Sequence, residues 1–344
     1  MIYIAIGSFL IVMTLVECDK QFRILSREGC YLALLLMIGL ASLRHGVGTD
    51  WDAYLTFYQN IEESSRVEIG YSYINNLFSH MGIHYNVFLF VMTTICIALI
   101  SSFFRQAGAL SAAAILMFYS DLFLYFNLSG MRQAVAISIT CFALRYAVAK
   151  KPLQFFSLVT VAASFHMSAV VFFIGYFIPR SRPKWHYLVW VCLGGLAFYY
   201  FLEPIAQFIT EHTLKNASYY LHGIEVQDNI IASYFIGGVK RLVVLGIVLV
   251  TWRSLKEKPY FLYLLNMYIF GLAIYFLFYT ISVDIGVRMS SYFTILDTLL
   301  VGLAILNASN ILTRLSIASL VSAICLYKLL GYASNPYYDY KFIF

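Results

Sequence analysis

The chain has 344 residues, of which 61% are hydrophobic and only 12% are charged, with a formal net charge of +6. Soluble domains average about 25% charged residues. This composition excludes an ordinary soluble domain, and we expect lipid to be the solvent for most of the chain. The basic residues do not share one soluble face, so the net charge gives no support for nucleic-acid binding.

Apolar runs long enough to cross a membrane recur from one end of the chain to the other. A spanning helix needs about 20 apolar residues, and sometimes as few as about 17. We predict spans near 2–16, 29–43, 86–104, 109–127, 131–149, 186–202, 233–252, 260–280, 289–307 and 311–331. The run 152–178 is too long for one comfortable span and short for two.

The distribution of Lys and Arg decides how the run 152–178 is interpreted. Basic residues favour cytoplasmic loops. A hairpin that turns near His166 places the basic clusters at 180–184 and 253–258 inside, with most of the other basic residues, whereas a single helix places both clusters outside. We therefore predict an all-α polytopic membrane protein of about 12 transmembrane or re-entrant helices, with both termini outside.

This topology predicts one integral membrane domain over residues 1–344. Its larger outer loops are expected at about 44–84 and 203–232, and an outer tail begins at "NPYYDY" (335–340). The cytoplasmic loops are short and basic. No internal repeat and no separate soluble domain is evident.

Five basic residues depart from this inward bias, because they lie at or just below the predicted outer ends of spans. They are Arg44, Arg132, Lys240, Arg241 and Arg288. Charge at this depth is costly and usually serves a site, and the planar fork of arginine suits phosphate oxygens. Arg132 and Arg288 also fall at helix N-termini, which attract anions. We predict an anion site near the outer surface; separate snorkelling of each arginine to lipid phosphates is the alternative.

The stretch "RHGVGTDWDAY" (44–54) gathers several further ionisable groups. Gly46 and Gly48 allow this segment to fold tightly over the mouth of the bundle. His45, Asp50 and Asp52 then become candidates to orient a sugar hydroxyl, to act as a base or to pair with an arginine. For Asp52 a simple ion pair is our first expectation.

Other polar residues leave more than one interpretation open. His166, in "SFHMSA", is a candidate proton acceptor at the predicted turn, or a buried histidine hydrogen-bonded to backbone. Tyr54 belongs to a group of outer tyrosines that either form the interfacial belt or stack on sugars. Asp121 and Asp297 lie within apolar runs and are either contacts between helices or members of a site. No nucleotide-binding or metal-binding motif is present, so we expect no cofactor and no metal.

An ordered set of short motifs resembles a known family. The motifs are "RHGVGTDWDAY", "EIGYSYINNLF" (68–78), "NLSGMRQAVAIS" (127–138), "SFHMSAVV" (164–171) and "VRMSSYF" (287–293). Together they resemble the EpsG branch of the Wzy-type polysaccharide polymerases, with Trp51 where the family pattern has tyrosine. Arg132, Gln133, His166 and Ser168 match its "RQ" and "FH-S" patterns.

The resemblance implies a glycosyltransferase, an O-antigen-polymerase-like enzyme of the bacterial inner membrane with its active site facing the periplasm. It would join repeat units of a surface polysaccharide carried on undecaprenyl diphosphate, without nucleotide or metal. A chain-length-regulating membrane protein is a further candidate partner. The architecture distantly resembles O-antigen ligases and other lipid-dependent (GT-C-like) glycosyltransferases.

The same resemblance suggests roles for individual residues. Arg44, Arg132, Arg241 and Arg288 would stabilise the leaving diphosphate. Either His166 or Asp50 would deprotonate the attacking sugar hydroxyl. The candidates for binding the remainder of the substrate are His45, Asp52, Tyr54, Gln133 and Lys240.

Two other functions remain candidates. One is ligase-like transfer of the glycan to another lipid, and the other is transport of a lipid-linked oligosaccharide. Transporters tend to place charge at the bilayer midplane and to show repeated halves. The predicted charge near one surface, without a repeat, favours an enzyme.

Overall fold

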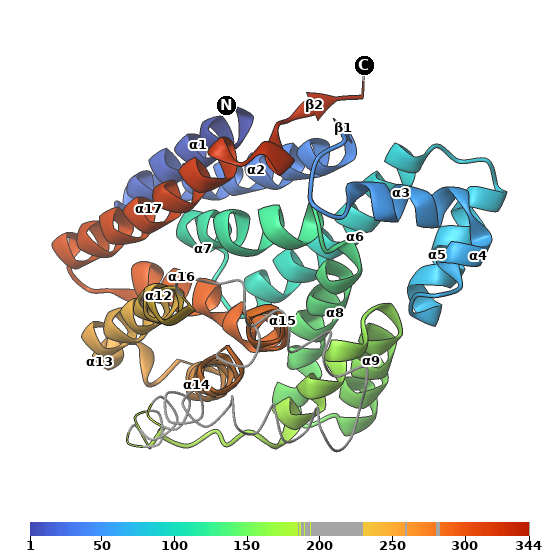
Figure 1. Ribbon diagram of the computed structural model, residues 1–344. Coiled ribbons are helices and arrows are strands. Elements are labelled where there is room, and N and C mark those ends of the chain that lie inside the picture. Colours follow the sequence, from blue (N-terminus) through green and yellow to red (C-terminus); the bar gives the residue numbers. More distant parts are fainter. Residues whose placement is uncertain are drawn as a thin grey trace.

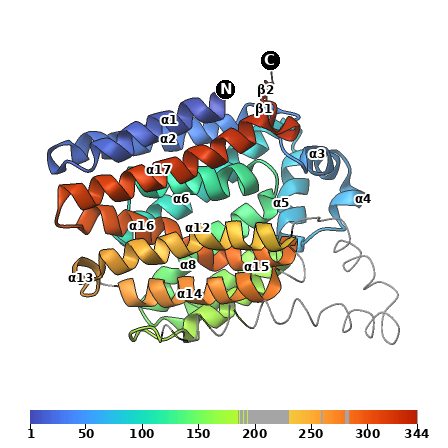
Figure 2. The ribbon, with the colours of Figure 1, turned by 60° about the vertical axis from the view of Figure 1, so that its left-hand side comes forward.

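A computed structural model describes residues 1–184, 186, 189, 193, 230–258, 260–279 and 283–343. The described part is a bundle of helices with one two-stranded antiparallel sheet (Figure 1). The first and last long helices, α1 (Ile2–Val16) and α17 (Ile311–Ser334), lie side by side (Figures 1 and 2). Most of the predicted span 186–202 and most of the predicted outer loop 203–232 lie outside the described residues.

The first half of the chain begins with two long helices and ends with a helical hairpin. Its elements are α1 (Ile2–Val16), η1 (Lys20–Phe22), α2 (Arg23–Ser42), β1 (Arg44–His45), α3 (Trp51–Gln59), α4 (Ile61–Ser64), α5 (Ile69–His80), α6 (Tyr85–Gln106), α7 (Ala112–Phe118), η2 (Tyr119–Asn127), α8 (Met131–Val148), α9 (Pro152–Phe165) and η3 (Met167–Phe177). The helix η2 has π-helical hydrogen bonding and η3 is a 3₁₀ helix.

The second half ends in the strand that completes the sheet. Its elements are α12 (Ile230–Val250), α13 (Trp252–Leu255), α14 (Phe261–Phe278), α15 (Val283–Thr294), α16 (Leu296–Asn307), α17 (Ile311–Ser334), η5 (Pro336–Tyr338) and β2 (Lys341–Phe342).

Five helical segments of the described residues are long and apolar enough to cross a membrane. They are Lys20–Ser42, Tyr85–Gln106, Phe261–Phe278, Val283–Asn307 and Ile311–Ser334. The predicted class, an all-α polytopic membrane protein, is confirmed. The number of about 12 segments stays a prediction.

The run 152–178 forms the hairpin that the charge distribution predicts. Helix α9 ends at Phe165, the backbone of His166 is extended (φ −156°, ψ 116°), and η3 packs back against α9. After η3, Arg180 donates to the carbonyl of Ala147, 2.6 Å away at the end of α8. The chain thus returns to the end from which α9 started. At 1.5 Å per residue α9 is about 21 Å long, short of a hydrocarbon core of about 30 Å.

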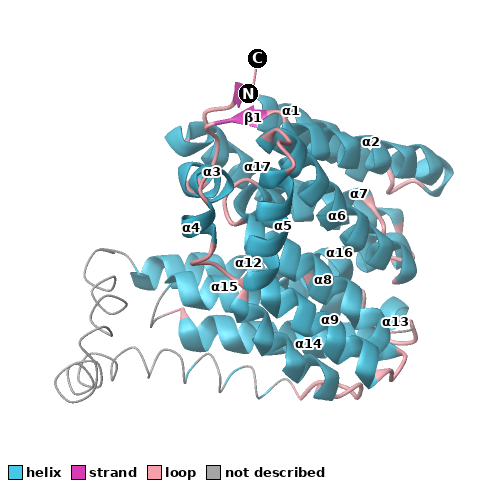
Figure 3. Cartoon of the chain, turned by 90° about the vertical axis from the view of Figure 1, so that its right-hand side faces the viewer, coloured by secondary structure: helices cyan, strands magenta, loops and turns pink. Residues whose placement is uncertain are grey.

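One end of the bundle collects the segments that were predicted to lie outside. Strand β1 pairs with β2 of the C-terminal tail, so that Arg44 lies opposite Phe342. The amide of Gly48 donates to the carbonyl of Tyr337 at 2.8 Å. The predicted outer loop 44–84 is largely helical, and α3, α4 and α5 lie along one side of the bundle (Figure 3). We refer to this end as the predicted outer end.

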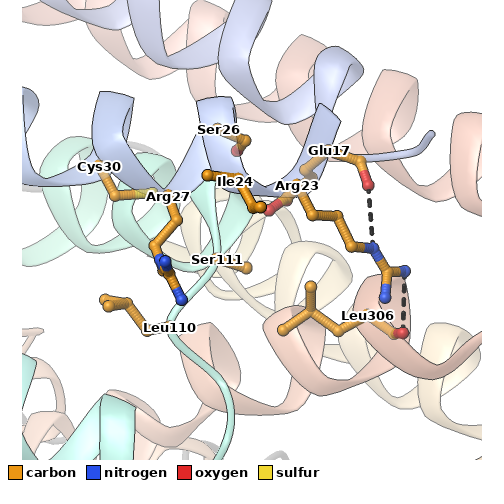
Figure 4. A pocket seen from close by; sticks show the side chains of 9 residues that line it. All are labelled: Glu17, Arg23, Ile24, Ser26, Arg27, Cys30, Leu110, Ser111 and Leu306. Carbon is orange, nitrogen blue, oxygen red and sulfur yellow. Dashed lines mark hydrogen bonds between the residues drawn. The ribbon is translucent and has the colours of Figure 1, made fainter. Parts of the chain in front are cut away.

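The opposite end is held together by buried charged groups. The carboxylate of Glu17 accepts hydrogen bonds from the amides of Ala112 (2.8 Å) and Ala113 (3.0 Å), and so caps the N-terminus of α7. The guanidinium of Arg23 donates to the carbonyl of Leu306 at 2.9 Å (Figure 4). A small cavity of about 170 Å³ lies between these segments. Glu17, at the end of α1, therefore links α1 to α7, and Arg23 links α2 to the end of α16.

We expect Gly48→Ala to lower the unfolding temperature of the purified, detergent-solubilised protein more than Gly46→Ala does. Both glycines have positive φ angles, 104° and 66°, which cost alanine about 1–2 kcal/mol. A Cβ on Gly48 would in addition overlap the backbone carbonyl of Leu128, whereas a Cβ on Gly46 would meet no atom within 4 Å. Equal shifts for the two variants would show that the approach of this segment to Leu128 does not stabilise the fold.

Candidate functional site

Arg132 is the centre of a polar cluster at the predicted outer end. It is the second residue of α8. Its backbone amide and Nε lie 3.3 and 3.4 Å from the hydroxyl of Tyr54 on α3, and its Nη1 forms an ion pair with Glu68, just before α5. The side chains of Arg132 and Glu68 are 25% and 20% exposed. The ion pair is thus partly shielded and still reachable from solvent.

His166 lies in the same cluster, at the turn of the hairpin. Its Nδ1 is 2.7 Å from Oγ of Ser168, which in turn lies 2.9 Å from the hydroxyl of Tyr292 on α15. Burial lowers the pKa of His166 to about 4; the positive charges of Arg132 and Arg288 act in the same direction and Glu68 opposes them. The imidazole is therefore neutral at neutral pH.

Gln133 joins α8 to α15 on the other side of this cluster. Its amide nitrogen donates to the backbone carbonyl of Arg288 at 2.7 Å, and the residue is buried. The side chain of Arg288 is 41% exposed and its Nε lies 3.8 Å from Asp284, one turn earlier on α15. Gln133 therefore positions Arg288 through the backbone, and the guanidinium remains open to an anion.

Arg44 does not have the accessible position predicted for it. It is 1% exposed, its Nη1 donates to the carbonyl of Asn127 at 2.7 Å, and its guanidinium lies 5.5 Å from the ring centre of Trp51. The prediction of direct diphosphate contact does not fit this burial. The position of Arg44 indicates instead that it holds the segment 44–51 against the end of η2.

Three other ionisable residues of the stretch 44–54 lie nearer the surface than Arg44, namely His45, Asp50 and Asp52. His45 is exposed and packs edge-on against Trp51, with ring centres 5.7 Å apart. Asp50 accepts a hydrogen bond from the hydroxyl of Thr49 at 2.9 Å. Asp52 is exposed on the first turn of α3 and makes no ion pair among the described residues. The ion pair first expected for Asp52 is thus not found in that part of the chain.

A second cluster of charged side chains lines a cavity of about 250 Å³ inside the bundle. Lys240 forms ion pairs with Asp121 and, at 3.8 Å, with Asp297; Lys328 forms an ion pair with Asp121. These residues come from α12, η2, α16 and α17. We call the cavity with its five charged residues, including Arg241, the charged cavity.

Arg241 gives the charged cavity its excess of positive charge. Its guanidinium lies 3.8 Å from the ring centre of Tyr275, and its Nη1 donates to the carbonyl of Gly237 at 2.9 Å. Three cations then face two carboxylates among the described lining residues. Because unbalanced charge is costly away from water, one further negative charge would be stabilised there.

The four arginines therefore do not form the single site that the sequence predicts. Arg132 and Arg288 lie near His166, Arg241 lines the charged cavity, and Arg44 is buried elsewhere. Tyr125 connects the two regions, since it lines the cavity and interacts with Arg288. Among the described residues no group of three or more His, Cys, Asp or Glu side chains is placed to hold a metal ion.

Comparison with known proteins identifies the group to which this arrangement belongs. The EpsG family profile matches residues 30–342, which is nearly the whole chain. The chain belongs to the EpsG family. This confirms the resemblance carried by the motifs, and EpsG membership indicates a membrane-bound, glycosyltransferase-like polymerase in polysaccharide synthesis. Neither the curated proteins nor the solved structures contain a match, so the likeness to GT-C-like enzymes stays a prediction.

Sequence reasoning did not select Glu68 in this EpsG-family chain and left Asp121 and Asp297 open. Glu68 stands in the motif "EIGYSYINNLF", but an acidic residue in a predicted outer loop resembles any solvated charge. The two aspartates carried a stronger signal, because a carboxylate in an apolar run needs a partner. Lys328, near the end of the last span, was the matching cation.

We expect Asp121→Ala to destabilise the protein by about 3–5 kcal/mol, because it leaves the largely buried Lys240 and the partly buried Lys328 without their shared partner. Asp284→Ala is the matched control, since that carboxylate is 69% exposed and lies 3.8 Å from Arg288. Loss of such a surface pair costs less than about 1 kcal/mol. The free energy of unfolding in detergent, measured for both variants, checks the difference. Similar losses would mean that the charged cavity is open to water.

Proposed function

We propose that the protein extends a surface polysaccharide on the periplasmic side of the bacterial inner membrane. In this reaction a growing glycan moves from undecaprenyl diphosphate to the sugar of a lipid-linked repeat unit, without nucleotide or metal. Membership of the EpsG family supports the broad activity. The observation that carries the proposal is the gathering of Arg132, Arg288 and His166 at one end of the bundle.

The donor diphosphate would bind where cations are in excess. Arg288 offers a partly exposed guanidinium in the middle of α15, and not at a helix N-terminus as the sequence predicted. Arg241 supplies the excess positive charge of the adjoining charged cavity. Donors fixed before the reaction stabilise charge that develops on the leaving group. Arg132 would join them once its carboxylate partner is displaced.

The acceptor sugar would approach from the side of the stretch 44–54. His45, Asp50 and Asp52 lie on the segment that covers the predicted outer end. Tyr54 is buried and uses its hydroxyl on Arg132, which favours a positioning role over sugar stacking. A chain-length-regulating membrane protein remains a candidate partner at the same face.

Transport of a lipid-linked oligosaccharide remains a second candidate function. The observation in its favour is the charged cavity, since transporters bind substrates among polar groups within the bundle. The two functions differ in where substrate accumulates. Loss of a transporter leaves single repeat units on the inner leaflet, whereas loss of a polymerase leaves single repeat units on the outer leaflet.

We expect Arg132→Lys to reduce polymerisation at least about 10²-fold, the usual effect of losing one donor to a developing charge, because lysine keeps the charge and loses the fork. The assay uses purified protein and a defined lipid-linked repeat unit, with polymer length as the readout. Arg66→Lys is the control, since Arg66 is exposed and its ion-pair partner among the described residues is Glu63 in the same segment. Full activity of Arg132→Lys in this assay would contradict the role of Arg132 in stabilising the leaving diphosphate. In cells that carry the variant, single repeat units retained on the inner leaflet would favour transport.

A further inference from the structure

We propose that Glu68 is the general base of the glycan transfer, released for this task when an anionic group of the substrate replaces it on Arg132. The inference rests on the function proposed above and names a residue that the sequence motifs do not assign. Its basis is the position of one carboxylate between the arginine and the histidine of the site.

Glu68 connects three separate parts of the predicted outer end. One carboxylate oxygen pairs with Nη1 of Arg132 at the start of α8, and the other accepts a hydrogen bond of 3.2 Å from the amide of Met167, directly after His166. Glu68 itself belongs to the segment of α3 to α5. The carboxylate thus lies between the candidate anion-binding residue and the hairpin turn.

The hydrogen bonding of His166 argues against this residue as the base. The amide of Ser168 donates to Nδ1 of His166 at 3.3 Å, so Nδ1 is an acceptor. A neutral imidazole with an acceptor at Nδ1 carries its proton on Nε2. In this state the ring has no free acceptor nitrogen, and Nε2–H is suited to donate a hydrogen bond to a substrate oxygen.

Asp50 is also less well placed than Glu68. Its carboxylate is hydrogen-bonded to Thr49 and forms no ion pair among the described residues, and its charge acts on the tyrosines Tyr54, Tyr125 and Tyr338 rather than on an arginine. Glu68, in contrast, interacts electrostatically with both Arg132 and His166. Of the carboxylates considered for the reaction, Glu68 is therefore the one in contact with the cationic site.

An anion that binds Arg132 would change the basicity of Glu68. Burial raises the pKa of Glu68, but backbone hydrogen bonds and the charge of Arg132 outweigh this effect and keep the pKa below its usual value. Phosphate oxygens compete for the same guanidinium fork. Once the substrate neutralises Arg132, the positive charge of Arg132 no longer lowers the pKa of Glu68. The carboxylate then becomes a stronger base while it remains partly buried.

The reaction step is then a direct displacement. The acceptor hydroxyl oxygen bonds to the anomeric carbon of the donor sugar, and the bond from that carbon to the diphosphate breaks. Its electron pair leaves on the diphosphate oxygen, close to Arg132 and Arg288. The hydroxyl proton moves to the carboxylate of Glu68 and from there to water. The base is thus available only when the anion-binding residue is occupied.

The test compares Glu68→Gln with Glu63→Gln in full-length purified protein, using a defined lipid-linked repeat unit. Removal of a general base costs about 10²–10⁴-fold in rate, and we expect that loss in kcat/KM for Glu68→Gln only. Glu63 is the matched control because it lies in the same outer segment and, within the part of the chain that the structure describes, forms its ion pair with the exposed Arg66. Added formate should restore part of the activity of Glu68→Ala, since it supplies the missing carboxylate.

The pH dependence separates a base from a residue that only holds Arg132 in place. The groups facing Glu68 are Arg132 on α8, His166 at the turn and Tyr292 on α15. The acidic limb of the kcat/KM profile should be present in the wild type and in Glu63→Gln, and absent in Glu68→Gln. Glu68→Asp keeps a carboxylate and should show the acidic limb at a lower overall rate. This variant provides the test if Glu68→Gln does not fold.

Several results would overturn the inference. One is a rate for Glu68→Gln within a few-fold of the control. Another is a slow variant that keeps the acidic limb and gains nothing from formate, which would leave Glu68 as a positioning residue. In both cases wild-type polymerisation would stand, so the proposed function would survive. Absence of polymerisation by folded wild-type protein would instead refute the proposed function itself.

Discussion

The ion pair between Arg132 and Glu68 is the interaction on which the arrangement of the predicted outer end depends. A guanidinium at the end of an apolar bundle is expensive unless a counter-charge and hydrogen-bond acceptors surround it. Glu68 supplies the charge and Tyr54 supplies the hydroxyl. Since both partners belong to the segment of α3 to α5, the same contacts that stabilise Arg132 also fix that segment against α8.

The charged cavity obeys the same constraint with a different result. Lys240 and Lys328 share the carboxylate of Asp121, and Asp297 is a second partner of Lys240. These four charges compensate one another, so the cavity owes its net positive charge to Arg241. The ion pairs also join α12 and α17 to η2 and α16. The same charged residues therefore hold these helices together and line a cavity that attracts an anion.

The sequence predicts how deep a residue lies in the membrane better than it predicts which helices surround that residue. Composition and the bias of basic residues suffice for the membrane class and for the hairpin at His166, because the cost of placing charge in lipid acts at a known depth. Arg44, Arg132 and Arg241 were all placed near the outer ends of spans, yet they face different surroundings. Which helices are neighbours depends on side-chain packing between distant segments, and hydropathy does not contain that information.

Glu68 shows the same limit at the level of a single residue. In the sequence it precedes a short amphipathic helix and resembles a solvated charge. Its hydrogen-bond partners, Arg132 and Met167, are 64 and 99 positions further along the chain. Its partners become known only when α5, α8 and the hairpin turn are brought together. A carboxylate that neutralises a partly buried arginine also competes with any anionic substrate for that arginine. Binding of the substrate and release of the carboxylate are then one event, because a single guanidinium cannot fully serve both.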